Sequence, residues 1–406
     1  MTQNSPYDRR LIGWLSVGQL ISWGSVFYLF SLIMPIVERD LQLSRAEASI
    51  AFGLALLTEG ALAFLVGRLI DKGHERLVMT FGSIMLSLCL FLLSFVSSAA
   101  QFYAVWIGLG VGMACCLYAP VFAVATRRFP LDYRRAIITL TFLGGLASTV
   151  FIPLMAWLFS AFGWRTGVVI LASMHLFICL PIHLYWLRDA PKRALANPAE
   201  TAAPLTTLHS HLSSPQFVWF AVFIVLMMGV TSSLPAHMIS LLRERQLSEF
   251  WVIAIPASIG LLQVFGRLLL YFFEHRIHID LINRFVPSFL PMGLLCLIAA
   301  TMLANSNGTL ALILICLFVL LWGMGNGMLT IVKGTAVAQY ISREHVASLN
   351  GALGLPQAIS RAMSPVALGL MWSQTWGYAI GLWVMLVICV LGITALSMAI
   401  RLAKPN

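Results

Sequence analysis

Long apolar segments constrain the fold of this chain more than any other feature. A helix that crosses a bilayer needs about 20 consecutive apolar residues, because lipid offers no partner for an unpaired backbone group. About twelve segments reach that length, at residues 11–37, 46–67, 77–98, 101–126, 136–162, 165–187, 217–242, 250–273, 281–304, 309–338, 348–373 and 376–401. The sequence therefore predicts an all-α integral membrane protein with twelve transmembrane helices in two pseudo-symmetric six-helix bundles.

The composition agrees with a membrane protein and argues against a soluble one. Of the 406 residues, 60% are hydrophobic and 10% are charged, and the mean hydropathy is +0.91. A soluble domain carries about 25% charged residues. A net charge of +10 could indicate a nucleic-acid partner in a soluble protein. Here the basic residues cluster in alternate loops, so we expect no nucleic-acid partner.

The distribution of basic residues predicts the topology. About 17 of the 25 Lys and Arg residues fall at the termini and in the loops of one side. The positive-inside rule therefore places both termini in the cytoplasm. We expect a multi-pass protein of the bacterial inner (cell) membrane. The first segment follows Arg9 and Arg10, is too long for a signal peptide and is expected to be retained.

Two similar halves divide the chain. The polar stretch near residues 187–215 is interpreted as a linker, which gives a bundle at 1–187, a cytoplasmic linker at 188–216 and a bundle at 217–406. Gln42-Leu43-Ser44 after the first segment is repeated as Gln246-Leu247-Ser248 after the seventh. Ser44 and Glu47 predict a capping box at the start of the second helix. Parallel halves of this kind are typical of secondary transporters that bind substrate near the midplane.

The loop between the second and third segments carries a motif, Gly67-Arg68-Leu69-Ile70-Asp71-Lys72-Gly73-His74-Glu75-Arg76. It resembles the cytoplasmic loop signature of the major facilitator superfamily, Gly-x-Leu-Ala-Asp-Arg-x-Gly-Arg-Arg. In this chain Ile70 replaces Ala, and Arg76 alone remains of the final basic pair. The resemblance implies the major facilitator fold over about residues 11–401. It also implies that Gly67, Asp71, Lys72 and Arg76 form the loop motif, with Asp71 helping to latch the two halves.

Charged residues inside the predicted helices are the main candidates for function. A charge at the bilayer centre costs about 2.5–3.5 kcal/mol on insertion scales, so such residues are functional by default. Four qualify, namely Glu59, Arg267, Lys333 and Arg361. Three of them are basic, which favours an anionic substrate.

Arg267 is the first candidate for binding that anion. Its segment, Gln263-Val264-Phe265-Gly266-Arg267, resembles the eighth-helix Asn-Gly-x-Gly-Arg pattern of the oxalate/formate antiporter and monocarboxylate transporter branch. In that branch the arginine binds the substrate carboxylate, and arginine suits this role because it donates two parallel hydrogen bonds. The alternative is an arginine whose side chain snorkels to the cytoplasmic surface.

Lys333 and Arg361 are the second and third candidates for substrate binding. Lys333 either snorkels or lines the cavity. Arg361 lies mid-segment in the predicted eleventh helix, where the same branch has a substrate-binding lysine about one turn earlier.

Glu59 and His237 are candidates for proton coupling or gating. Glu59 either pairs with Arg361 or takes up the coupling proton, since burial favours the neutral carboxyl. His237 resembles the histidine of a His-x-x-Pro-Leu-Leu pattern in bacterial members of the branch, with Ser240 in place of Pro. The ordinary pKa of histidine suits proton sensing, and a gate or a packing role is the alternative.

Aromatic and glycine residues complete the expected site. Trp23, Tyr28 and Tyr118 are assigned to the substrate cavity, with interhelical packing as the alternative. The run Gly323-Met324-Gly325-Asn326-Gly327 allows either close helix packing or flexing.

The sequence thus predicts a monomeric secondary active transporter that moves a small organic anion, of the monocarboxylate type, by alternating access. Proton coupling (symport) or anion exchange (antiport) would drive it. The alternatives are an exporter of amphiphilic drugs or toxic anions and a non-transporting membrane sensor. We expect no cofactor, no metal site and no enzymatic activity, because no ligand set, phosphate-binding loop or activated nucleophile occurs in the sequence.

Overall fold

The computed structural model describes residues 7–129, 132–188, 212–273, 279–303, 308–341, 349 and 352–402. Helices account for the regular structure of this part of the chain, apart from one isolated bridge between Ser373 and Gly377. The chain forms two compact units, residues 1–196 and 197–406, and each is described by itself.

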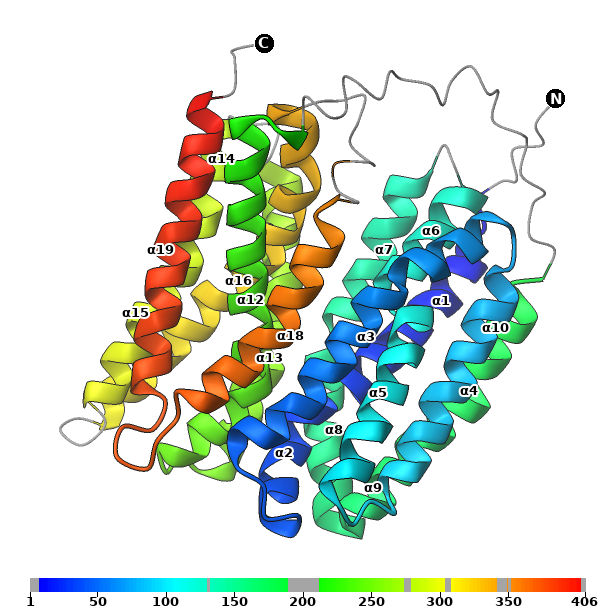
Figure 1. Cartoon of the computed structure of the whole chain (residues 1–406), viewed down its shortest axis with the longest axis horizontal. Coiled ribbons are helices and arrows are strands. Elements are labelled where there is room, and N and C mark those ends of the chain that lie inside the picture. Colours follow the sequence, from blue (N-terminus) through cyan, green and yellow to red (C-terminus); the bar gives the residue numbers. More distant parts are fainter. Residues whose placement is uncertain are drawn as a thin grey trace. The chain divides into compact units, whose positions relative to one another are not determined.

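Unit 1 contains the first six predicted spans (Figure 1). Its elements are α1 (Arg9–Ser22), the π-helical turn η1 (Trp23–Phe27), α2 (Leu29–Asp40), α3 (Arg45–Asp71), α4 (Glu75–Leu93), α5 (Ala99–Cys116), α6 (Tyr118–Arg128), α7 (Tyr133–Gly145), α8 (Ala147–Phe162), α9 (Trp164–Met174), the π-helical turn η2 (His175–Cys179) and α10 (Leu180–Trp186). Helix α5 packs against both α3 and α4, and α1 packs against α7.

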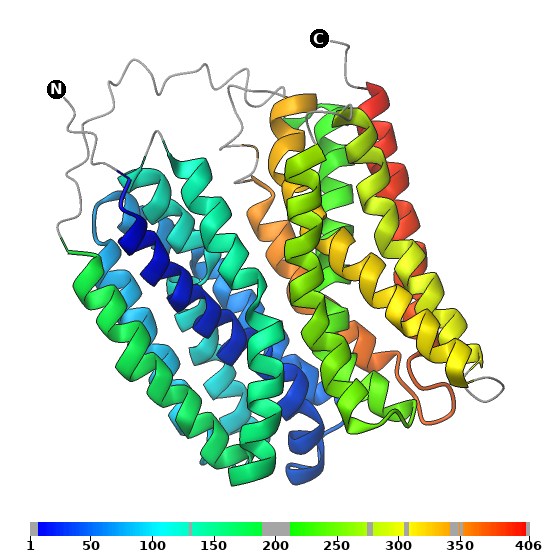
Figure 2. The same cartoon turned by 180° about the vertical axis from the view of Figure 1, so that it is seen from behind.

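Unit 2 contains the later spans. Its elements are α12 (Pro215–Glu244), α13 (Glu249–Phe273), α14 (Ile279–Phe285), the 3₁₀ turn η3 (Val286–Ser288), α15 (Phe289–Leu303), α16 (Gly308–Tyr340), α18 (Gly354–Leu370) and α19 (Ala379–Leu402). Helix α12 packs against both α18 and α19 (Figure 1), and α16 packs against α13 and α15 (Figure 2).

The predicted fold class is confirmed. Among the described residues, eleven helical stretches are long and apolar enough to cross a membrane. Helix α18, with 17 residues, occupies the position of the remaining predicted span. The linker predicted at 188–216 lies mostly outside the described residues.

The short sequence repeat between the two halves begins with the same backbone conformation in both. Gln42 and Gln246 are the two described non-glycine residues with positive φ, at 55° and 52°. Each follows the end of a helix, α2 or α12, and reverses the chain before the next helix begins. In unit 1 the predicted capping box is confirmed, since Ser44 accepts from the Glu47 amide and the Glu47 carboxylate accepts from the Ser44 amide.

The span predicted at 101–126 is present as the helical stretch Ala99–Arg128, which contains one break. It breaks at Leu117, where ψ is −162°. Pro120 has no N–H to donate to the Cys116 carbonyl, which an uninterrupted helix would require. The Gln19 side chain fills that role, because its Nε2 donates to the Cys116 oxygen over 2.6 Å. The first span is likewise interrupted, by the π-helical turn in which the Tyr28 amide donates to the Trp23 carbonyl over 3.2 Å.

Candidate functional site

Unit 1 holds the predicted aromatic residues in one cluster. The rings of Trp23 and Tyr118 are 4.8 Å apart, and Phe27 lies 5.1 Å from Trp23 and 5.4 Å from Tyr28. All four rings are half-buried. Gly144 makes room for Tyr118, because a Cβ there would lie 2.4 Å from the phenol oxygen. The break at Leu117 and the turn η1 thus place Trp23, Tyr28 and Tyr118 together, linked through Phe27.

A buried hydrogen bond joins the two π-helical turns behind this cluster. Ser25 in η1 lies 2.7 Å from Nε2 of His175 in η2, and the Ser25 hydroxyl donates to the Ile21 carbonyl. A hydroxyl has one proton, so His175 Nε2 carries the hydrogen that Ser25 accepts. His183 is held in a similar way by Ser83, over 2.7 Å. Within the described residues, no group of three His, Cys, Asp or Glu side chains could hold a metal ion.

The loop motif lies at the junction of α3 and α4. Asp71 ends α3 and is exposed, and Lys72 follows as the C-cap. Gly73 has a φ of 93°, a left-handed conformation that glycine adopts without strain. Arg76 donates from Nε to the Leu184 carbonyl over 2.8 Å. The latching of the two halves by Asp71 stays a prediction.

Sequence reasoning missed Glu75, the most deeply buried charge of the motif. Its side chain has 0% exposure and accepts from Arg127 Nη1 over 2.9 Å and from Arg128 Nε. Arg127 also donates to the Ile70 carbonyl, and Arg128 donates to the Arg188 carbonyl. This cluster therefore ties α3, α4, α6 and the end of α10 together. The sequence did contain one signal of this role, because Glu75 stands at a position where the family signature has a basic residue.

Arg267 is positioned by the crossing of α13 and α16. A Cβ on Gly266 would lie 2.8 Å from the Met324 oxygen, and a Cβ on Gly327 would lie 2.2 Å from the Gln263 oxygen. The two backbones therefore approach as closely as glycine permits. Across this crossing the half-buried Arg267 donates from Nε to the Gly327 carbonyl over 3.3 Å.

Lys333 and Arg361 lie against the same stretch of α12. Lys333 Nζ is 3.5 Å from the Met228 sulfur. The Ser232 hydroxyl, one turn further along α12, lies 3.2 Å from the Arg361 carbonyl and 3.0 Å from the Gly229 carbonyl, and its one proton is shared between them. The Arg361 carbonyl needs a donor because Pro365, four residues on, has no N–H. The two side chains are partly buried, and their charges are close enough to repel each other.

His237 is fully buried in unit 2 and has a hydrogen-bond partner at each ring nitrogen. Nε2 lies 2.9 Å from the Pro365 carbonyl, and Nδ1 lies 2.9 Å from the Tyr378 hydroxyl. A carbonyl can only accept, so Nε2 carries the hydrogen. His237 therefore connects α12, the kink of α18 and the start of α19, and its predicted coupling role stays a prediction.

Replacing His237 by Phe is expected to lower the stability of the protein by about 2–3 kcal/mol, because two buried polar groups lose their partner. Tyr378→Phe removes one of these bonds and is expected to cost about 1 kcal/mol. The denaturation midpoints of the purified variants in detergent would check this order. A His237→Phe variant as stable as the parent protein, yet without proton-driven uptake, would instead support a coupling role.

Glu59 lies half-buried on α3, beside another close crossing. A Cβ on Gly110 would lie 2.5 Å from the Ala55 oxygen and 2.8 Å from Thr58. This crossing fixes the helix from which Glu59 projects. Glu59 and Arg361 belong to different units, and their pairing stays a prediction.

The comparison with protein families decides the class of the protein. The model of the Major Facilitator Superfamily matches residues 15–365. The chain belongs to this superfamily of membrane transporters. It is thus a multi-pass membrane transporter for a small-molecule substrate.

Individual relatives are more distant. The chain is 21% identical to the uncharacterized MFS-type transporter YcxA of Bacillus subtilis (strain 168) over 337 residues, which cover 82% of this chain and 81% of YcxA. It is 27% identical to the multidrug resistance protein MdtL of Shigella flexneri serotype 5b (strain 8401) over 185 residues, or 44% of this chain and 45% of MdtL.

Solved structures share the fold. A bacterial homolog of the human lysosomal transporter Spinster, in an inward-facing and unoccupied conformation, superposes with a TM-score of 0.73 at 18% identity, covering 98% of this chain and 97% of that one. A mutant of the nucleoside transporter NupG gives a TM-score of 0.72 at 15% identity, covering 96% and 99%. At this identity the likeness concerns the fold alone.

Proposed function

We propose that this transporter carries a small organic anion of the monocarboxylate type by secondary active transport. The observation that carries the proposal is the pair of neighbouring cations, Lys333 of α16 and Arg361 of α18, which lie against one stretch of α12. The sequence has no acidic residue between Asp280 and Glu344, the stretch that contains Lys333, or after Glu344, the stretch that contains Arg361. Two neighbouring cations within apolar spans form an environment that favours a bound anion.

Arg361, Lys333 and Arg267 would contribute to anion binding in different ways. The guanidinium of Arg361 can donate two parallel hydrogen bonds to a carboxylate, whereas the Lys333 ammonium acts as a compact point charge. Arg267 is held on the Gly327 carbonyl, two turns before Lys333 on α16. In this proposal Lys333 and Arg361 bind the anion and Arg267 assists. The resemblance of the Arg267 and His237 segments to the monocarboxylate and oxalate/formate branch supports the choice of substrate.

The aromatic cluster of unit 1 is proposed to contact the apolar part of the substrate. Trp23, Tyr28 and Tyr118 are half-buried, which leaves part of each ring available for contact. Alternating access, with the two halves rocking around a midplane site, would expose the anion to one side at a time. Glu59 or His237 would take up a coupling proton, and anion exchange is the other route.

Uptake of radiolabelled monocarboxylates into proteoliposomes tests the proposal. Lys333→Gln and Arg267→Ala are expected to lower saturable uptake by about tenfold or more, since each removes a charge-assisted contact. Lys333→Arg keeps the charge and is expected to retain part of the uptake. Dependence on an inward proton gradient would separate symport from exchange.

Arg243→Gln is the matched control. Arg243 is a cation of the same unit, but it is exposed and paired with Glu249 over 3.1 Å. Its substitution is expected to leave uptake unchanged. An unaltered denaturation midpoint shows that each variant is folded. Absence of carboxylate uptake by the unmodified protein, in either orientation, would overturn the proposal.

Export of amphiphilic compounds is the second candidate. It is favoured by the similarity to the multidrug resistance protein MdtL, which covers less than half of either chain. Growth in the presence of drugs, compared between cells that express the transporter and cells that express Lys333→Gln, would distinguish export from carboxylate transport. Resistance that persists in the variant would favour an exporter that does not need the cationic pair.

A further inference from the structure

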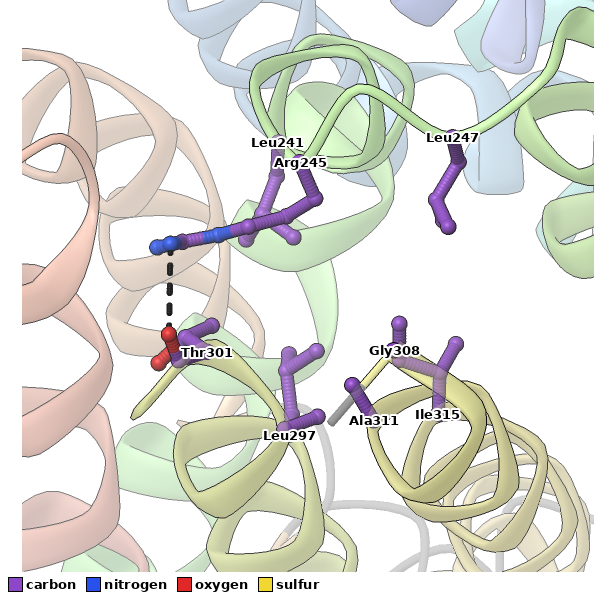
Figure 3. Close-up of a pocket in the computed structure, with 9 residues that line it drawn as sticks. Leu241, Arg245, Leu247, Leu297, Thr301, Gly308, Ala311 and Ile315 are labelled. Carbon is purple, nitrogen blue, oxygen red and sulfur yellow. Dashed lines mark hydrogen bonds between the residues drawn. The ribbon is translucent and has the colours of Figure 1, made fainter. Parts of the chain in front are cut away.

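A small cavity lies at the end of unit 2 where α12 and α15 end and α16 begins, and Figure 3 shows the residues that line it. It has a volume of about 60 Å³. Aliphatic side chains from α12, α15, α16 and the turn after α12 form most of its wall, namely Leu241, Leu247, Leu297, Ala300, Ala311 and Ile315. Arg245 is the one charged residue among those that line it.

The Arg245 guanidinium has more donors than acceptors in this cavity. Nη1 donates to the Thr301 carbonyl over 3.4 Å, a long hydrogen bond (Figure 3). Nε is buried and has no hydrogen-bond partner among the described residues. Burial lowers the pKa of the guanidinium from its ordinary value, since the charge loses hydration. A half-buried cation with an unused donor calls for a further acceptor.

Two acids are close to Arg245 in the sequence, and the charge of one of them, Glu244, acts on the guanidinium. Glu244 accepts from the Trp372 indole over 2.8 Å, and Glu249 pairs with Arg243. No acidic residue lines the cavity in the described structure. The buried Nε of Arg245 thus lacks an acceptor among the described residues, and a bound ligand can supply one.

The depth of the cavity in the membrane indicates which anion can reach Arg245. Helices α12 and α15 end beside it and α16 begins there, so the cavity lies where spanning helices reach the headgroup layer. Basic pockets between transmembrane helices bind lipid headgroups on the cytoplasmic side of membranes, and an arginine can bind a phosphate in the same way at the opposite face. A phospholipid offers a phosphate for the arginine and acyl chains for the aliphatic wall.

We propose that this cavity binds the phosphate of a membrane phospholipid, with Arg245 as its cationic ligand. The positive-inside distribution would place this lipid in the outer leaflet. The same oxyanion chemistry fits a free inorganic phosphate, but the aliphatic wall favours a ligand with attached chains. The site is separate from the residues proposed for transport.

Lipid titration followed by native mass spectrometry tests this proposal on the full-length protein in detergent. Delipidated protein is titrated with dioleoyl phosphatidylglycerol, with dioleoylglycerol as the phosphate-free lipid. We expect one saturable phosphatidylglycerol whose affinity falls about tenfold in Arg245→Gln, because a charge-assisted contact is lost. Arg243→Gln is the matched control, and it is expected to bind as the unmodified protein does.

A second variant keeps the charge and closes the cavity. Ala311→Leu is expected to weaken binding with Arg245 intact, and the denaturation midpoint without lipid checks that both variants fold. Equal lipid binding by Arg245→Gln and the unmodified protein would overturn the proposal. So would competition by millimolar inorganic phosphate, which would indicate a free-anion site, or equal binding of dioleoylglycerol, which would indicate apolar contact alone.

Discussion

Glu75→Ala is expected to destabilise the protein by about 3–5 kcal/mol, because it leaves two poorly hydrated arginines without their shared counter-charge. The Glu75 side chain has 0% exposure, and the side chains of Arg127 and Arg128 have 13% and 11%. The denaturation midpoint of the purified protein in detergent is the direct measurement. Glu75→Gln keeps the shape and some of the hydrogen bonds, so its cost is expected to be smaller.

The exposed pair Arg243–Glu249 is the control for this prediction. These side chains have 42% and 68% exposure, and a solvated pair contributes about 0–1 kcal/mol. Glu249→Ala is therefore expected to leave the midpoint nearly unchanged. If Glu75→Ala were as mild as Glu249→Ala, the buried cluster would not hold the loop, α6 and α10 together.

Gly327→Ala is expected to cost about 3 kcal/mol, since the new methyl group cannot fit the crossing of α13 and α16. Its Cβ would lie 2.2 Å from the Gln263 oxygen and 2.7 Å from the Gln263 Cα, both backbone atoms that cannot rotate away. The helices would have to separate, and Arg267 would lose its position on the Gly327 carbonyl. Both the denaturation midpoint and carboxylate uptake are expected to fall.

Gly13→Ala provides the contrasting glycine. It lies within α1, and a Cβ there would meet nothing within 4 Å. Alanine favours a helix over glycine by up to about 1 kcal/mol, so this variant is expected to be neutral or slightly more stable. A Gly327→Ala protein as stable as the parent would show that the crossing of α13 and α16 has room for a methyl group. The role left for the run Gly323–Gly327 would then be helix flexing.

The fold was predictable because lipid permits few alternatives. Every spanning backbone must satisfy its own hydrogen bonds, so apolar length alone indicates a helix. Ser44 and Glu47 fixed the start of α3 through local contacts, which sequence spacing also reveals. The interruption at Leu117 was not predicted, although Pro120 was visible, because the donor that replaces its N–H comes from Gln19 on another helix.

The site was predictable in its residue types and less so in its contacts. Hydropathy singles out Lys333 and Arg361 as charges within spans, but only the packing of α16 and α18 on α12 brings them to one place. Glu75 was missed because its position suggested a solvated loop, and its burial depends on α6. The sequence alone places Arg245 in a loop, and it does not reveal the cavity around Arg245, because α12, α15 and α16 together build it.

The hydrogen bond between Ser25 and His175 affects which way the side chains of the first span face. A π-helical turn holds one residue more than an α-helical turn, so the helix beyond it is rotated by roughly 100° relative to an uninterrupted one. Such an extra residue can in principle migrate along a helix, which would turn Trp23 away from Tyr118. By joining η1 to η2, this hydrogen bond opposes such a migration in both helices and so helps to keep Trp23 against Tyr118.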